Sequence, residues 1–470
     1  MHPYTVKFAG GLDFNVLNPL LLVVTLAAVI LIFALPRKYA VVPFLFAIFL
    51  TPLGQQFYVN GLHLFLNRIV ILATFIRALT SKDPERPLCA SGWTSIDTAF
   101  AAYVVICATA TLIQYPTMTA LINQLGYLWD YLLAYFALRA LIRNQHDTLL
   151  VLKCFAVLMV ILASEMLFEQ IRTVNLFGLL GGVASVPDFR GGKVRSQGVF
   201  QHALTAGAFA ATAVPLFLLM WKRHTARWIA VVAIVSATAM AIMTQTSTSL
   251  VTEAAGIFAI FVWPLRQKMR TVRIGLVLSI IGLALVMKAP VWFLIDHIDL
   301  TGSSSGYQRA ELINQFIVHF SSWWMAGTKN AASWGWDIWD TQNMFVAAGE
   351  TGGLAAFVFF ILVISRSFGR LGKARKRATT ASQEWTVWLL GAALFATMVS
   401  FFGVNYFDQV RIAWFVLLSM ICATTGPMLR RRPLARLRVK LQVPSAPYVA
   451  PLTTEMSEVP QHSRDPRFLE

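Results

Sequence analysis

Residues 302–350, GSSSGYQRAELINQFIVHFSSWWMAGTKNAASWGWDIWDTQNMFVAAGE, differ from the chain before and after them, which consists mainly of long apolar runs. This stretch places charged side chains among five tryptophans. It is too long for a tight turn between helices and too aromatic for a disordered linker. Tryptophan is enriched where a polar phase meets an apolar one. We therefore expect an ordered cap outside a membrane, covering a polar cavity, and we place the working part of the protein there.

The apolar runs on both sides predict the fold class. The chain has 470 residues, of which 57% are hydrophobic and 13% charged, a composition that excludes a soluble globular protein. Runs of about 20 apolar residues are long enough to cross a hydrocarbon core of roughly 30 Å. We predict an all-α, polytopic membrane protein with twelve or thirteen transmembrane helices. The predicted spans are 16–35, 39–55, 62–80, 96–115, 120–141, 148–168, 198–221, 227–243, 248–264, 272–288, 342–365, 384–405 and 409–427.

The formal net charge of +17 is distributed in short clusters between these spans. The clusters lie at 37–38, 77–86, 139–143, 222–227, 266–273, 366–377 and 430–440. Lys and Arg are in excess in the cytoplasmic loops of membrane proteins, so the clusters predict the inner face and argue against a nucleic-acid partner. We expect one transmembrane domain over 1–427, with outer loops at 169–197 and 289–341. Residues 428–470 are expected to form a basic, disordered, cytoplasmic tail.

Some cations nevertheless fall on the predicted outer face, against this bias. They are Arg190, Lys193, Arg195 and Arg309. An anionic ligand would explain them, because a guanidinium fork matches two phosphate oxygens. Gly198 and its neighbouring glycines would let the backbone approach such a ligand closely. The alternative is ordinary ion pairing with Asp188, Glu311 or Asp337.

Other polar side chains of the outer segments are candidates for proton transfer or binding. His202 and His319 could each act as a base or form a structural hydrogen bond. Asp340 and Glu350 flank Asn343 at the predicted start of a span, where a carboxylate can bind substrate or simply cap the helix.

Charged residues inside the predicted spans are costly in lipid, so they should face a cavity or one another. We single out Arg68, Asp130, Glu165, Glu253 and Lys288, together with Glu169 at the end of its span. Of these, Arg68 lies near the outer end of its span and could join the cationic site. The polar turn 244–249, TQTSTS, could line the wall of the cavity. The four cysteines lack metal-binding spacing, and no phosphate-binding loop or dinucleotide motif occurs in a convincing context, so we expect no metal and no cofactor.

Three segments resemble the bacterial O-antigen ligase and O-antigen polymerase superfamily. Residues 195–207, RSQGVFQHALTAG, are similar to the family's arginine followed by Gly-x-Phe and a helix rich in small residues. Residues 306–309, GYQR, with the following helix to His319 and the turn 324–327, WMAG, resemble its arginine-led helix. Residues 343–353, NMFVAAGETGG, resemble its Asn helix start and Glu-x-Gly turn.

The resemblance implies a GT-C-like membrane glycosyltransferase that uses an undecaprenyl-diphosphate-linked donor without a metal. Arg195 and Arg309 would hold the diphosphate and stabilise it as it leaves. The catalytic candidates are Arg195, Arg309, His319, Asp340 and His202. The candidates for substrate binding are Arg68, Arg190, Lys193, Gly198, Tyr307, Asn343 and Glu350.

Gln342 stands where ligases of this family carry a histidine, and a neutral amide cannot act as a general base. This departure favours a polymerase of O-antigen or exopolysaccharide repeat units over a ligase that transfers glycan to lipid A core or protein. A lipid-glycan flippase is the rival from another class, but it would need a polar path to the inner face. The expected partners are a lipid-linked oligosaccharide, the bilayer of the bacterial inner membrane, and a chain-length regulator.

Overall fold

The structure is a computed structural model, and it describes residues 15–59, 62–80, 89, 92–221, 226–297, 306–335, 338 and 341–430. The described residues belong to one unit of the chain. Asp337 and Asp340 and the predicted tail beyond Arg430 lie outside them.

The described chain is all-α apart from two short hairpins. The α-helices are α1 (Pro19–Ala34), α2 (Arg37–Leu50), α3 (Leu66–Thr80), α4 (Ser95–Gln114), α5 (Met118–Leu128), α6 (Ala134–Leu141), α7 (Gln145–Arg172), α8 (Leu176–Leu179), α9 (Ala203–Phe217), α10 (Arg227–Met243), α11 (Ser247–Phe261), α12 (Met269–Val286), α13 (Gly306–Val318), α14 (Phe320–Trp323), α15 (Met344–Lys376), α16 (Ala381–Ser400) and α17 (Asp408–Arg430). A π-helix, η1 (Trp129–Leu133), joins α5 to α6, and short 3-10 helices are η2 (Leu218–Met220), η4 (Trp263–Lys268), η5 (Val291–His297) and η6 (Ala331–Trp334). The strands β1 (Gln56–Val59) and β2 (Leu62–Phe65) pair antiparallel, as do β3 (Asp188–Arg190) and β4 (Lys193–Arg195).

Each of the thirteen predicted ranges contains a helix, with α5, η1 and α6 together filling one of them. Six of the described helical segments are long and apolar enough to cross a membrane. They are Ser95–Gln114, Gln145–Arg172, Ala203–Met220, Trp263–Val286, Met344–Lys376 and Gln409–Arg430. The helices α1, α10 and α11 are apolar but shorter. The prediction of an all-α chain with several helices able to cross a membrane is therefore confirmed, and the count of twelve or thirteen spans stays a prediction.

Two predicted boundaries were wrong. The basic run 366–377 was expected to be a loop, but α15 continues through it to Lys376 and only four residues separate it from α16. Ala, Lys and Arg are good helix formers, so charge alone does not end a helix. The range 39–55 also overestimates α2, which ends at Leu50, just before Pro52.

The bundle core is apolar but contains one fully buried ion pair. Arg139 on α6 donates from Nε to Asp97 Oδ1 on α4 at 2.8 Å, and neither side chain is exposed. Tyr135 donates its hydroxyl to the same carboxylate oxygen at 2.6 Å. Asp97 also completes a capping box with Thr94 at the start of α4. This network fixes the register of α4 against α6.

The described part of the predicted outer cap has a small core of its own. Its buried side chains are Leu312, Phe316, Trp323, Trp334, Ile338 and Val346. Phe316 and Trp323 stack with ring centroids 3.9 Å apart, and Trp323 Nε1 donates to the carbonyl of Phe316 at 2.7 Å. The expectation of an ordered segment holds for these residues. Trp323 and Trp334, however, are buried in this core and do not lie at a boundary between a polar and an apolar phase.

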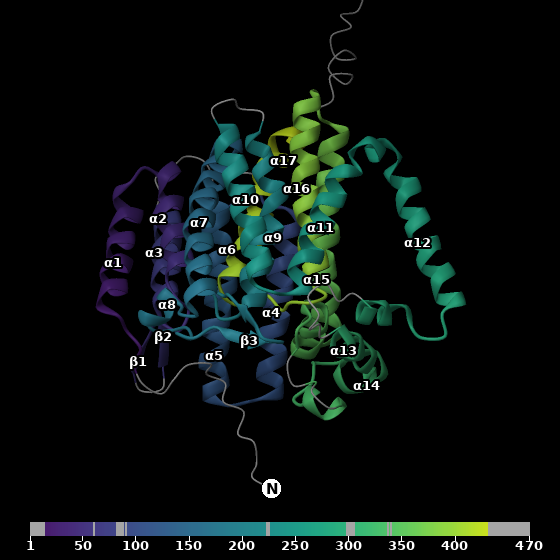
Figure 1. Cartoon of the computed structure of the whole chain (residues 1–470), viewed down its shortest axis with the longest axis horizontal. Helices are drawn as coiled ribbons and strands as arrows, with labels where there is room; N and C mark the ends of the chain where they lie inside the picture. Colours follow the sequence, from purple (N-terminus) through teal and green to yellow (C-terminus); the bar gives the residue numbers. More distant parts are fainter. Residues whose placement is uncertain are drawn as a thin grey trace, which may run out of the picture. The chain divides into compact units, whose positions relative to one another are not determined.

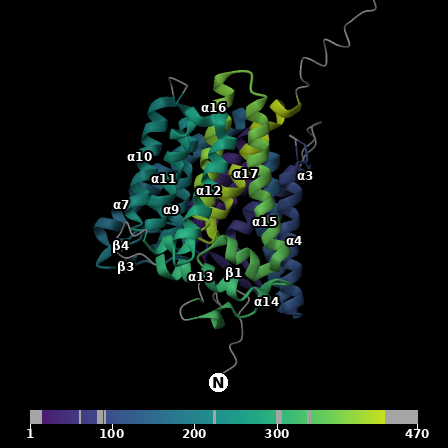
Figure 2. The same ribbon diagram turned by 90° about the vertical axis from the view of Figure 1, so that its right-hand side faces the viewer.

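Figures 1 and 2 show β1, β3, α13 and α14 at the same end of the helix bundle, which we call the hairpin end. Helix α12 differs from the other long helices because none of its residues is buried. Its closest packing is with η4 and η5, the elements that precede and follow it in the chain. Figure 1 shows it standing apart from α11, α15 and α16.

Candidate functional site

The hairpin β3–β4 arranges three of the predicted cations. Its register pairs Asp188 with Arg195 and Arg190 with Lys193. The turn residues Gly191 and Gly192 have φ of 56° and 74°, a conformation that favours glycine and suits a two-residue hairpin. Arg190 and Lys193 therefore flank the turn, and Arg195 lies at the base of the hairpin.

Arg195 has a carboxylate partner, as the ion-pair alternative proposed. Its Nη1 lies 3.0 Å from Asp188 Oδ2, but the Asp188 side chain is 63% exposed while that of Arg195 is only 13% exposed. The Nε of Arg195 is buried and has no hydrogen-bond partner among the described residues. An exposed ion pair contributes about 0–1 kcal/mol. Asp188 therefore satisfies Arg195 only in part.

The three residues after Arg195, which we call the anchored turn (196–198), are tied firmly to the bundle. Ser196 donates its backbone N–H to the carbonyl of Met243 on α10 at 3.1 Å. Its hydroxyl donates to the carbonyl of Met166 on α7 at 3.0 Å. Glu169 Oε2, fully buried on α7, accepts the backbone N–H groups of Gln197 and Gly198 at 3.0 and 2.9 Å.

Gly198 needs to be glycine at this turn. Its φ is +60°, and a Cβ there would lie 3.1 Å from Glu165 Oε2. The carbonyl of Gly198 also accepts a hydrogen bond from Asn175 Nδ2 at 2.7 Å. The intramembrane carboxylates Glu165 and Glu169 thus face this turn, and the turn holds the base of the hairpin in one position.

Arg309 supplies the second element of the site. It lies in the first turn of α13 and is only 9% exposed, and its Nε has no hydrogen-bond partner among the described residues. The carboxylate nearest in sequence, Glu311, accepts a hydrogen bond from Gln315 at 2.6 Å. Burial, followed by the charges of Arg190 and Arg195, lowers the pKa of Arg309 to about 10. The guanidinium therefore stays charged at neutral pH.

Arg190, Arg195 and Arg309 together form what we call the arginine cluster. Their charges act on one another although two of them come from the β3–β4 hairpin and one from α13. The described carboxylate paired with this cluster is the exposed Asp188. A buried cation without a carboxylate is costly, and an anion with several oxygens would satisfy its free donors. The burial and the charge of these side chains therefore fit a phosphate-bearing ligand.

The two candidate histidines occupy different places. His202 is the exposed N-cap residue of α9, four residues after Gly198, and its ring lies edge-on to Phe407 at 5.7 Å. His319 follows the other end of α13, ten residues after Arg309, or about 15 Å along a helix axis. Its Nδ1 lies 3.0 Å from the carbonyl of Gln315, and its ring stacks on Trp334 at 5.5 Å. His202 thus lies close in sequence to the anchored turn, whereas the half-buried His319 stacks on Trp334 of the cap core.

The residues predicted at the start of α15 have structural partners. Asn343 is the N-cap, and its Oδ1 accepts the N–H groups of Phe345 and Val346 at 2.9 and 3.2 Å. Glu350 Oε2 accepts from Thr341 Oγ1 at 2.6 Å, while its Oε1 is buried without a partner among the described residues. The sequence analysis considered capping for the flanking carboxylates Asp340 and Glu350, but in the structure Asn343 caps the helix.

The Glu-Thr-Gly-Gly sequence after residue 349 is a helix break. Gly353 has φ of +69°, and the carbonyl of Trp324 accepts the N–H of Leu354 at 2.8 Å. The break therefore docks the turn 324–327 against α15. Tyr307 is exposed beside Phe293, and Asp340 lies outside the described residues.

Arg68 forms a separate group with Asp130. Its Nε and Nη2 each lie 2.9 Å from an oxygen of the Asp130 carboxylate, on the π-helix η1. Arg411, which the sequence analysis did not single out, places Nη2 3.9 Å from the same carboxylate. The Arg68 side chain therefore contacts η1 and strand β2, and the intramembrane charges Arg68 and Asp130 face each other as expected.

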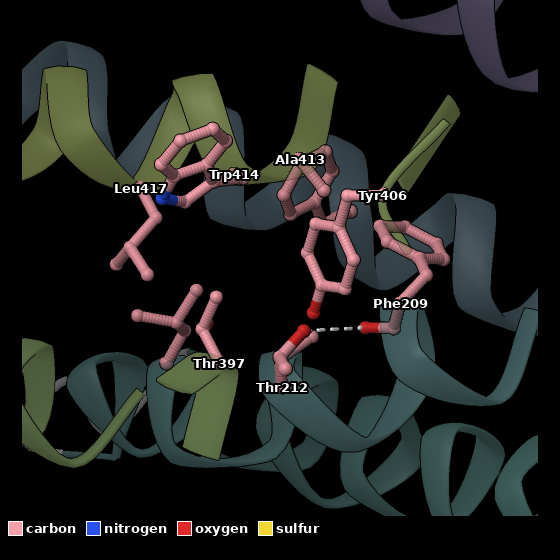
Figure 3. A pocket seen from close by; sticks show the side chains of 10 residues that line it. Phe209, Thr212, Thr397, Tyr406, Ala413, Trp414 and Leu417 are labelled. Carbon is pink, nitrogen blue, oxygen red and sulfur yellow. Dashed lines mark hydrogen bonds between the residues drawn. The ribbon is translucent and has the colours of Figure 1, made fainter. Parts of the chain in front are cut away.

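A small cavity lies inside the bundle between α7, α9, α16 and α17. Its lining is mostly apolar, with the hydroxyl groups of Thr212, Thr397 and Tyr406 and the indole of Trp414 (Figure 3). It contains none of the arginines, so it is distinct from the arginine cluster. Tyr406 directly precedes Phe407, the residue against His202.

Comparison of the chain with protein-family models and with curated protein sequences finds no match.

Proposed function

We propose that the protein is a membrane glycosyltransferase that polymerises oligosaccharide repeat units carried on undecaprenyl diphosphate. The observation that carries the proposal is Arg309, a buried cation without a carboxylate partner among the described residues, grouped with Arg190 and Arg195. Lipid-bound diphosphate has the charge and the many acceptor oxygens that such a cluster lacks. The loose resemblance of the segments 195–207, 306–327 and 343–353 to O-antigen polymerases and ligases supports the same assignment.

The proposal places the arginine cluster at the periplasmic face of the bacterial inner membrane. In this arrangement the thirteen helical ranges all cross the bilayer in a GT-C-like fold, and the basic clusters and the C-terminus are cytoplasmic. The segment 289–341 then forms the large periplasmic loop. A chain-length regulator would act as a separate partner.

The chemistry is a displacement at the anomeric carbon of the donor glycan. A hydroxyl oxygen of the acceptor sugar forms the new bond to this carbon, and the bond to the diphosphate oxygen breaks with its electron pair on the departing undecaprenyl diphosphate. Arg195 and Arg309 stabilise the charge that develops there, without a metal. We assign the hydroxyl proton to His202, because it follows the anchored turn, whereas His319 is stacked in the cap.

Glycan analysis of a deletion strain tests the proposal. The strain carries the wild-type gene, Arg309→Ala, Arg309→Lys, an empty vector, or Arg172→Ala as a control that removes an exposed arginine at the end of α7. We expect single repeat units on the lipid carrier with the empty vector and with Arg309→Ala, weak rescue by Arg309→Lys, and normal polymer with Arg172→Ala.

The other outcomes identify the rival functions. Long polymer that accumulates on the carrier would show a ligase that transfers glycan to lipid A core or protein. Absence of any lipid-linked unit from the periplasm would show a flippase. Normal polymer with Arg309→Ala would remove the arginine cluster from the mechanism.

A further inference from the structure

The group formed by Arg68, Asp130 and Arg411, which we call the Asp130 cluster, carries a surplus positive charge. Two guanidinium groups face one carboxylate. Arg68 is well satisfied, because Nε and Nη2 bind Asp130 and Nη1 donates to the carbonyl of His63 at 2.9 Å. The positive charge that Asp130 does not neutralise is therefore that of Arg411.

Arg411 has few partners for a side chain that is only 14% exposed. Its ion pair with Asp130 is long, at 3.9 Å. Its other close neighbour is Tyr131, which forms a side-chain hydrogen bond with it and whose ring centroid lies 4.5 Å from the guanidinium carbon. Its Nε is buried without a hydrogen-bond partner among the described residues. A cation in this position costs free energy unless an anion compensates it.

The backbone around the cluster also favours an anion. Arg68 and Arg411 lie in the first turns of α3 and α17, where the helix dipole is positive. Asp130 lies on the π-helix η1, and such insertions in α-helices are frequent at functional sites. Gly126 packs against the Arg68 guanidinium, since a Cβ there would be 2.7 Å from Nη2.

The Asp130 cluster and the arginine cluster are separate groups. They have no residue in common. Strand β2 runs directly into α3, so Arg68 is at the hairpin end of the bundle. The His202–Phe407 contact joins the two sides, because His202 follows the anchored turn by four residues and Phe407 precedes Arg411 by four.

We propose that the Asp130 cluster, through Arg411, binds the diphosphate of a second lipid-linked substrate, the acceptor, while the arginine cluster binds that of the donor. The inference rests on the proposed function, because a polymerase of lipid-linked units has two substrates that each carry a diphosphate. The sugars of the two substrates then meet beside His202 and Phe407.

Binding stoichiometry tests this assignment independently of catalysis. The purified protein in phosphatidylcholine vesicles is titrated with radiolabelled undecaprenyl diphosphate. We expect two molecules bound per wild-type chain, one in Arg309→Ala, one in Arg411→Lys, and none when both changes are combined. Arg411→Lys retains the charge beside Asp130 but loses the fork, so it keeps the fold while weakening diphosphate binding.

A structural role for Arg411 gives a different result. If Arg411 served only to neutralise Asp130, a chain with both Asp130→Asn and Arg411→Gln would still bind two molecules of undecaprenyl diphosphate. We expect this double variant to bind one. Two sites in Arg411→Lys with unchanged affinity would overturn the inference.

Further measurements identify the source of the bound anion and distinguish failure of this inference from failure of the proposed function. Phosphatidylglycerol added to the vesicles should not displace the second molecule, and displacement would show that a phospholipid headgroup fills the cluster. One site in the wild type that Arg309→Ala abolishes would overturn the second site and leave the proposed function intact. No binding by the wild type would reject both.

Discussion

At the scale of single residues, a change at Arg309 can distinguish a ligand site from a structural ion pair. Arg309→Met removes a buried cation that has no carboxylate to leave behind among the described residues, so we expect the melting temperature to stay equal or to rise. Transferase activity should fall by about 100- to 1,000-fold, as for loss of a group that stabilises a leaving anion. Thermal unfolding in detergent and an in vitro polymerisation assay measure the two effects.

Arg172→Met is the matched control for this change, because it removes an exposed arginine and should alter neither quantity. A large drop in the melting temperature of Arg309→Met would show that the guanidinium has a structural partner, and the ligand assignment would fail.

Arg195 and Asp188 give a second test at this scale. Because Asp188 is 63% exposed, its ion pair with Arg195 contributes about 1 kcal/mol at most. We expect Asp188→Asn to retain activity within about fivefold of the wild type, whereas Arg195→Ala loses about 100-fold. Equal losses in the two variants, measured in the same assay, would mean that the ion pair and not the ligand determines the role of Arg195.

The sequence identified Arg195 and Arg309 because they violate the charge bias of the outer face. The rule that charges inside predicted spans are costly could have found Arg411, the third residue of the span predicted to begin at 409. It could not find the pairing of Arg139 with Asp97, because these residues are 42 positions apart and Arg139 resembles the other cations of an inner loop. Such pairs depend on packing between helices, which no local pattern records.

At the scale of elements, α15 combines an ordinary membrane helix with a break near its start. Gly353 has φ of +69°, and a Cβ there would lie 2.7 Å from the carbonyl oxygen of Met325. We expect Gly353→Ala to lower the free energy of unfolding by about 2 kcal/mol or more, through backbone strain and this clash.

Gly369, on the same helix, is the control for Gly353. A Cβ at Gly369 meets nothing within 4 Å, so Gly369→Ala should stabilise the helix by about 0.5–1 kcal/mol. Chemical denaturation of the two variants measures both changes. A Gly353→Ala protein as stable as Gly369→Ala would show that the break is not required.

The lengths of the apolar runs were sufficient to locate the helices of the bundle, but they did not predict the elements between those helices. Run length located each of the thirteen helical ranges, since hydrophobic length is a property of local sequence. The hairpin β3–β4 was not predicted as strands, because three-residue strands leave no period to detect. The helical continuation of α15 to Lys376 was missed because the charge run was taken as a loop.

At the scale of the whole molecule, α12 is the long apolar helix that the described bundle leaves uncovered. We expect lipid on all its sides. Single cysteines placed at Leu276, Val277 and Leu278, which point in different directions around the helix, should all react with a lipid-soluble maleimide.

Cysteines at the buried positions Ala233 and Ala237 of α10 are the controls and should stay unreacted, like the four buried native cysteines. Protection of one of the three α12 positions would show that a protein partner or a second copy covers that side.

From the isolation of α12 we also expect a mechanical effect. At one end, η4 holds Arg266 3.4 Å from Glu384 and over the ring of Trp263 at 4.2 Å; at the other, η5 packs against α13, the helix that carries Arg309. A helix of 18 residues spans about 27 Å, so a bilayer that is thicker or thinner than this must tilt it or pull on its ends. Polymerisation measured in phosphatidylcholine vesicles of increasing acyl-chain length should therefore pass through a maximum, because bilayer thickness would shift α13 and with it Arg309.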